Sequence, residues 1–256
     1  MAAAFPLSSS NAALASVWRA SELGCEPLRT QDTGHAALNA LLPGGGWPVG
    51  ALIELLQDTA HAEWRLLAPL LATLGGAPGS PSQVVLVGAP WLPFAPALAG
   101  QGMAPQQLLS VQGDTPAALL WATGQALRCA DVAAVLAWLP RSKSASLRRL
   151  QVAAQQHGKL LFVVRGIQAR SDSSPAPLRL ALSLAPGPLQ QLQVDVFKRR
   201  GPPLDQPLAL AARPPRLQAL LAASRARARR RQQATVVLPV QGVVHALARI
   251  AANDAA

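Results

Sequence analysis

The stretch Thr33–Leu56, TGHAALNALLPGGGWPVGALIELL, places the tightest constraint on the fold of this 256-residue chain. Its first part spaces apolar residues three and four apart, as an amphipathic helix does, and the glycine run Gly44–Gly46 is expected to end that helix. Ala51–Leu56 is apolar except for Glu54 and has the length of an interior strand. The stretch therefore predicts a short helix, a glycine turn and a buried strand in succession.

The rest of the chain alternates between strand-like and helix-like segments. Short apolar runs predict strands at 83–87, 132–139, 160–164, 178–184 and 192–197, and helical spacing predicts helices at 64–74, 116–128 and 147–157. The last two strands are expected to pair antiparallel, and 202–215 to form an edge strand plus linker. This alternation predicts an α/β fold, a three-layer sandwich with a mostly parallel central sheet.

The order of these segments over about residues 30–215 resembles the RecA-type core. The motif T-G-x-x-x-L-x-x-x-L followed by G-G-G-W-P-x-G, with Trp47 and Pro48 in the glycine turn, is closer still to the ImuA family of translesion-synthesis accessory proteins. The resemblance implies a RecA-like core at 30–215. The residues outside it are expected to form an N-terminal helix or arm at 1–29 and a basic C-terminal helical extension at 216–256.

A phosphate-binding loop, G-x-x-x-x-G-K-[ST], would follow the first strand of an active RecA-type ATPase. On an ungapped alignment Gln57 and Ala62 replace its glycines, Glu63 takes the lysine position and Trp64 takes the Ser/Thr position. A carboxylate repels a polyphosphate, and a tryptophan offers no oxygen to magnesium. We therefore expect a degenerate loop that binds no ATP and no other cofactor.

Two further catalytic elements of such an ATPase are missing. Pro90 is the nearest residue to the position of the carboxylate that activates water, and the strand at 132–139 ends in Ala137-Trp138-Leu139 without an acidic residue. The four histidines and two cysteines show no metal-ligand spacing. The sequence thus predicts a protein without catalytic or metal-binding residues and disfavours the alternative of an active RecA-type ATPase.

The net charge of +11 is concentrated at the C-terminal end. Residues 1–195 carry twelve basic and ten acidic residues, a net of +2, whereas residues 196–256 carry eleven basic and two acidic residues, a net of +9. The helix expected at 217–233 contains five closely spaced arginines: Arg225, Arg227, Arg229, Arg230 and Arg231. Contact with DNA phosphate or with a partner is one interpretation of this run, and a solvated tail is the other.

Weaker candidates for DNA or partner contact lie within the core. Arg165 and Arg170 belong to the segment 165–177, whose Ser, Pro and Gly content predicts a mobile loop. The turn Lys198-Arg199-Arg200 is either a subunit interface or a solvated turn. Basic residues at the start of the 147–157 helix could contact phosphate, but a solvated helix start is favoured.

The remaining features indicate a cytoplasmic protein. No apolar run reaches the roughly 18 residues that a membrane helix needs, and the first basic residue is Arg19, so the charged start of a secretory signal is absent. Cys25 and Cys129 are expected to be buried thiols in a reducing compartment, with a disulfide or metal site as the minority alternative.

The resemblance implies a function in the SOS response. An ImuA-type protein is expected to be a non-catalytic accessory factor in translesion DNA synthesis, with an ImuB-like homologue of Y-family polymerases and an error-prone C-family polymerase as partners. RecA and DNA are implied as further partners. The alternative is a SulA-like inhibitor of cell division that binds FtsZ, which the basic C-terminal region disfavours.

Overall fold

A computed structural model describes residues 29–58, 61–74, 83–185, 191–202, 204 and 206–211, together with short helical pieces at 223–224, 226–227 and 229–230. The chain divides into two compact units, residues 1–212 and residues 213–256. Residues 1–28 of the expected N-terminal helix or arm and residues 231–256 of the expected C-terminal extension lie outside the described residues.

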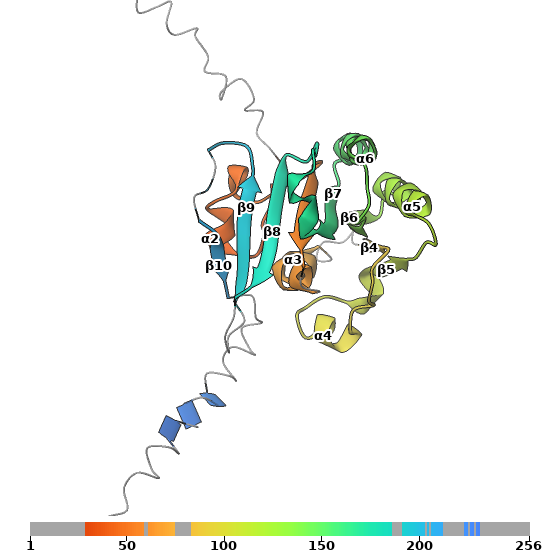
Figure 1. Ribbon diagram of the computed structural model, residues 1–256. Helices are drawn as coiled ribbons and strands as arrows, with labels where there is room; N and C mark the ends of the chain where they lie inside the picture. The colour runs from red at the N-terminus through yellow and green to blue at the C-terminus, as the bar shows by residue number, and fades with distance from the viewer. Residues whose placement is uncertain are drawn as a thin grey trace, which may run out of the picture. The chain divides into compact units, whose positions relative to one another are not determined.

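The first unit is built on an eight-stranded sheet with the order β10-β9-β8-β3-β7-β6-β4-β5 (Figure 1). Its strands are β3 (Leu52–Gln57), β4 (Gln83–Val87), β5 (Leu108–Val111), β6 (Val132–Trp138), β7 (Leu160–Gly166), β8 (Leu178–Leu184), β9 (Leu192–Lys198) and β10 (Leu208–Leu210). The pairs β8–β3, β3–β7, β7–β6, β6–β4 and β4–β5 are parallel, whereas β9 is antiparallel to both β8 and β10. β3 therefore lies inside the sheet, paired with β7 over its full length and with β8 from Ile53 to Gln57.

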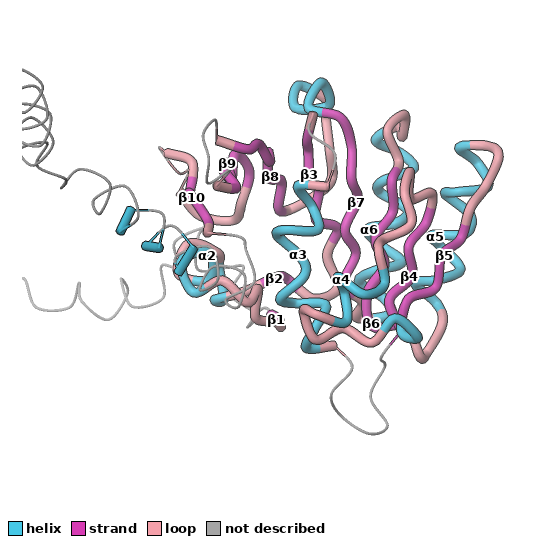
Figure 2. The backbone as a smooth tube through the Cα atoms, turned by 90° about the horizontal axis from the view of Figure 1, so that it is seen from below, coloured by secondary structure: helices cyan, strands magenta, loops and turns pink. Residues whose placement is uncertain are grey.

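Helices cover both faces of this sheet (Figure 2). α3 (Ala62–Thr73) packs on one face with α2 (Ala36–Asn39) and α4 (Ala95–Ala99), where Leu38, Leu66 and Leu98 belong to one buried apolar cluster. α5 (Pro116–Arg128) and α6 (Ser144–His157) pack on the other face, where Leu127 and Leu147 belong to a second cluster. The expected α/β fold with a mostly parallel central sheet is confirmed, and its layers are compatible with a three-layer sandwich.

Local sequence signals account for the ends of α5 and α6. Thr115 caps α5 by accepting a hydrogen bond from the backbone N–H of Ala118 at 3.1 Å, and Pro116 follows at the first helical position, where its missing N–H does no harm. Gly158 ends α6 in the left-handed region with φ of 56°, which a residue with a Cβ rarely adopts. Both helices therefore begin or end where the residue type requires it.

The stretch before β3 forms a small separate sheet. α2 ends at Asn39, before the glycine run, and Pro43–Gly45 forms the 3-10 turn η1. β2 (Trp47–Pro48) then pairs antiparallel with β1 (Thr30–Gln31). Trp47 is fully buried and its ring meets Phe162 of β7 edge-on, with ring centroids 5.3 Å apart. The tryptophan of the glycine turn thus anchors this segment to the core.

Two expectations from the sequence need correction. Cys129 is an exposed free thiol at the end of α5, where the Sγ lies 3.5 Å from the carbonyl oxygen of Gln125, so it is not buried. The segment expected to be a mobile loop over 165–177 instead contains the 3-10 turn η3 (Ile167–Ser171), which several side chains attach to the sheet. Among the described residues, no helix combines the length and apolar character needed to cross a bilayer.

Candidate functional site

The carboxyl end of β3 and the first turn of α3 hold the residues that align with the phosphate loop. Gln57, the last residue of β3, donates a hydrogen bond from Nε2 to Oε2 of Glu63, and its Oε1 accepts one from the backbone N–H of Glu63 at 3.1 Å. Glu63 is only 2% exposed, and this burial raises the pKa of its carboxyl above the ordinary value, although the bond from Gln57 acts in the opposite direction. A carboxylate of the chain itself therefore occupies the first turn of α3.

Two tryptophans, one of them the residue after Glu63, stack on each other. Trp64 of α3 stacks on Trp138 at the end of β6, with ring centroids 6.4 Å apart and planes inclined by 29°. Trp138 is 8% exposed, and its Nε1 has no hydrogen-bond partner among the described residues. Trp64 is the residue aligned with the Ser/Thr position of a phosphate loop, and Trp138 lies at the end of the strand that carries no acidic residue. In the part of the chain described, no three His, Cys, Asp or Glu side chains gather to form a metal site.

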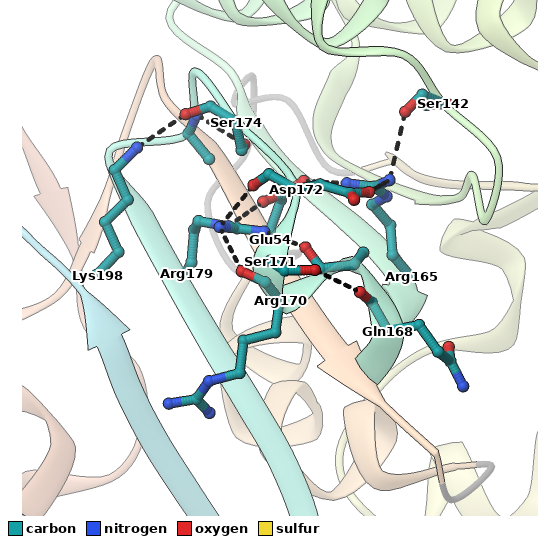
Figure 3. Close-up of polar contacts among 12 residues, drawn as sticks. Glu54, Ser142, Arg165, Gln168, Arg170, Ser171, Asp172, Ser174, Arg179 and Lys198 are labelled. Atoms are coloured by element: carbon teal, nitrogen blue, oxygen red, sulfur yellow. Dashed lines mark hydrogen bonds and ion pairs between the residues drawn. The ribbon is translucent and has the colours of Figure 1, made fainter.

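A buried charge cluster joins β3 to its two neighbouring strands, β7 and β8 (Figure 3). Glu54 of β3 is fully buried between two arginines of the neighbouring strands. Its Oε1 lies 3.1 Å from Nη1 of Arg165 on β7, and its Oε2 accepts a hydrogen bond from Nε of Arg179 on β8. A single acidic residue in an apolar strand must find such partners, because an unpaired buried charge is very costly.

The same two arginines hold η3 against the sheet. Arg165 reaches Oδ2 of Asp172 at 2.8 Å and the carbonyl oxygen of Ser142 at 3.3 Å. Arg179 donates from Nη2 to the carbonyl oxygen of Ala169 at 2.7 Å, and from Nη1 to the carbonyl oxygens of Arg170 and Asp172. The two arginines thus attach η3 and Asp172 to strands β7 and β8.

Arg165 and Arg170 occupy different environments in this cluster. Arg165 is 5% exposed, so its guanidinium is not accessible to a DNA phosphate in this conformation. Arg170 is half-exposed, pairs with Asp195 of β9 at 2.7 Å and lies over the ring of Phe197, 4.4 Å from its centroid. Both side chains therefore hold η3 in place.

The basic turn after β9 is also partly engaged. Lys198 donates to the carbonyl oxygen of Ser174 at 2.8 Å, and partial burial, followed by the charge of Arg179, lowers its pKa. Arg199 donates to the carbonyl oxygens of Leu41 and Pro202, which ties the turn to the end of the α2 segment. Arg200 is exposed. Of these three candidates, Lys198 and Arg200 are exposed, whereas Arg199 is partly buried.

The arginine run belongs to the second unit. Arg227, Arg229 and Arg230 lie in helical pieces and are exposed, whereas Arg225 and Arg231 lie outside the described residues. Helical geometry at 227, 229 and 230 agrees with the helix expected there. Contact of this run with DNA or a partner stays a prediction.

Lys159, from the chain's one Gly-Lys pair, has a structural position. Its Nζ donates to the carbonyl oxygens of Ala130 at 2.9 Å and Val132 at 2.6 Å, at the start of β6. Burial lowers the pKa of this lysine. Lys159 therefore bonds to backbone at the amino end of β6, whereas the residues aligned with the phosphate loop follow the carboxyl end of β3.

Sequence reasoning missed Arg179 and the importance of Glu54. The available signal was a lone carboxylate inside the apolar run Ala51–Leu56, which already requires a buried cation. The sequence does not say which cation, because the two partners lie 111 and 125 residues further along the chain.

No protein-family model matches this chain, and no curated protein matches it significantly. Among solved structures, SulA from Pseudomonas aeruginosa is similar over 44% of this chain and 97% of its own length, with 24% identity and a TM-score of 0.37. A similarity of this size carries no argument about function.

Proposed function

We propose that this protein is a non-catalytic accessory factor of the ImuA type, which acts as a scaffold in SOS-induced translesion DNA synthesis. The observation that supports the non-catalytic role is the filled carboxyl edge of β3. Glu63 and Gln57 bond to each other there, and Trp64 stacks on Trp138.

This arrangement opposes nucleotide binding in two ways. A phosphate group at the first turn of α3 would meet the Glu63 carboxylate, and it would have to displace the bonds between Glu63 and Gln57. The stacked rings provide no oxygen ligand for a magnesium ion, which prefers carboxylates, phosphates and water. Pro90, at the position aligned with the activating carboxylate, has no side-chain base.

The scaffold role follows from the sequence resemblance and from the charge distribution. The proposed partners are an ImuB-like homologue of Y-family polymerases and an error-prone C-family polymerase, with RecA and DNA as further candidates. The exposed arginines at 227, 229 and 230 belong to a region with a large positive net charge, which suits an acidic partner or DNA.

Two measurements test this proposal. We expect no rise in the melting temperature of the full chain on addition of magnesium and ATP, and a rise that is lost on changing residues 57–64 would contradict the non-catalytic role. Nuclease-treated pull-downs from DNA-damaged native cells should recover translesion polymerase subunits with the full chain. Recovery of FtsZ instead would assign the protein to the division inhibitors.

A further inference from the structure

A groove of about 360 Å³ lies between α5 and α6 and is open to solvent. Its lining is mostly apolar and small: Ala117, Leu120, Trp121, Gly124 and Arg128 from α5, and Ser146, Arg149, Leu150 and Ala153 from α6. Leu150 is buried at 5% exposure, whereas Trp121 is 68% exposed. The two helices thus present an apolar trough with one uncovered aromatic side chain.

Gly124 keeps this trough open. Glycine within a helix costs about 1 kcal/mol relative to alanine. A Cβ added at Gly124 would meet no atom within 4 Å, so the packing of this chain does not require glycine at this position. The glycine leaves room for a side chain from another molecule.

Two arginines stand in the lining of the groove without acidic partners. Arg128, in the last turn of α5, and Arg149 of α6 are both exposed. α5 and α6 contain no aspartate or glutamate, and no ion pair to either guanidinium is present among the described residues. The groove therefore combines an apolar floor with uncompensated positive charge, which is complementary to an acidic ligand.

We propose that the α5–α6 groove binds an acidic peptide segment of a partner protein, with an aliphatic or aromatic side chain between the helices and carboxylates on Arg128 and Arg149. This inference rests on the proposed scaffold function and specifies the chemistry of one contact. Trp121 contributes the kind of exposed aromatic surface that carries binding energy at protein interfaces.

The lining favours a peptide over nucleic acid. Single-stranded nucleic acid is bound by a continuous basic track and by several aromatic rings on which bases stack. This groove offers one ring, two guanidinium groups and an aliphatic floor between them. An apolar side chain flanked by carboxylates fits this set, because both of its parts find a matching surface.

Selection from a phage-displayed library of random peptides on the immobilised full chain tests the assignment. We expect the selected peptides to combine aspartate or glutamate with an aliphatic or aromatic residue. Gly124→Leu fills the groove and replaces glycine by a better helix former, so the fold is retained while peptide affinity falls. Arg149→Glu should weaken binding roughly tenfold, since it replaces an attraction by a repulsion.

Arg148→Glu is the matched control, because it makes the same charge change on α6 at an exposed residue outside the groove lining. Basic or uncharged selected peptides, or equal affinity of wild type and Gly124→Leu, would overturn the proposal. So would a labelled oligothymidine that displaces the peptide and loses affinity on Gly124→Leu, since the groove would then be a nucleic-acid site. The peptide selection uses only the immobilised chain, whereas the scaffold proposal is tested by pull-down of polymerase subunits. A negative result in one experiment is therefore distinct from a negative result in the other.

Discussion

At the scale of single residues, Glu54 is the side chain on which the buried charge cluster depends. It is fully buried between Arg165 and Arg179, which are each 5% exposed. Glu54→Ala leaves both guanidinium groups without their shared carboxylate, and removing one partner of a buried pair typically costs about 3–5 kcal/mol. We expect a loss of that order in the free energy of unfolding measured with urea.

Arg170→Ala is the control for this substitution. It removes an ion pair to Asp195 in which both side chains are partly exposed, and exposed pairs contribute about 0–1 kcal/mol. A smaller loss for Glu54→Ala than for Arg170→Ala would show that the cluster does not support the fold.

Glu63 makes stability depend on pH. Burial raises its folded pKa above the unfolded value, so the folded state binds this proton more tightly than the unfolded chain does. Its contribution to stability is therefore fully present below the unfolded pKa and is lost as pH rises through the folded pKa. We expect Glu63→Gln to be more stable than wild type above that window, with the difference shrinking as pH falls.

Urea unfolding of both proteins across this pH window measures the difference. Asp58→Asn serves as the control, because it changes a neighbouring exposed carboxylate at the same edge. A difference between Glu63→Gln and wild type that does not vary with pH would show that Glu63 keeps its ordinary pKa.

At the scale of elements, the sequence predicts best where local signals are sufficient. β4, α5 and β8 have the expected bounds, because each follows from its own apolar pattern or from the cap at Thr115. η3 could not be predicted, since it is held by Arg179, which Glu54 binds in turn, whereas the Ser and Pro content of the surrounding segment 165–177 predicts a loop. The stacking of Trp64 on Trp138 could not be predicted either, because it joins a helix and a strand that are far apart in the sequence.

The contact between Gly34, which lies just before α2, and Pro69 of α3 gives a prediction at this scale. Gly34 and Gly45 share a left-handed backbone, with φ of 77° and 76°, but their surroundings differ. A Cβ at Gly34 would lie 2.3 Å from Cβ of Pro69 in α3, whereas one at Gly45 would meet nothing within 4 Å. Gly45→Ala should therefore cost about 1–2 kcal/mol from backbone strain alone.

Gly34→Ala adds overpacking to the same strain. Inserting a group into a filled site costs typically 1–3 kcal/mol more, so we expect a larger drop in the free energy of unfolding than for Gly45→Ala. Equal losses for the two variants would mean that Pro69 of α3 moves away from residue 34 without a cost in free energy.

At the scale of the whole molecule, the positive charge is concentrated in the C-terminal residues 196–256. Residues 1–195 carry nearly balanced charge, and their arginines Arg165 and Arg179 are buried and bonded to neighbouring groups. The net of +9 over residues 196–256 includes the arginine run, of which residues 227, 229 and 230 are exposed. Salt-dependent binding to DNA is therefore expected to depend on this run rather than on Arg165 or Arg170.

Replacing Arg225, Arg227, Arg229, Arg230 and Arg231 by glutamine in the full chain tests this expectation. Each phosphate neutralised on single-stranded DNA contributes about 0.7 to the slope of log affinity against log salt concentration. Five contacts would thus account for a slope of roughly 3.5, and the glutamine variant should lose up to that amount. A control variant with lysine at the same five positions keeps the charge and should keep the slope. Anisotropy titrations with a labelled oligonucleotide over a salt series measure the slopes. Because both variants keep the chain length, an unchanged slope in the glutamine variant would place any DNA contact elsewhere, with Arg200 as the next residue to change.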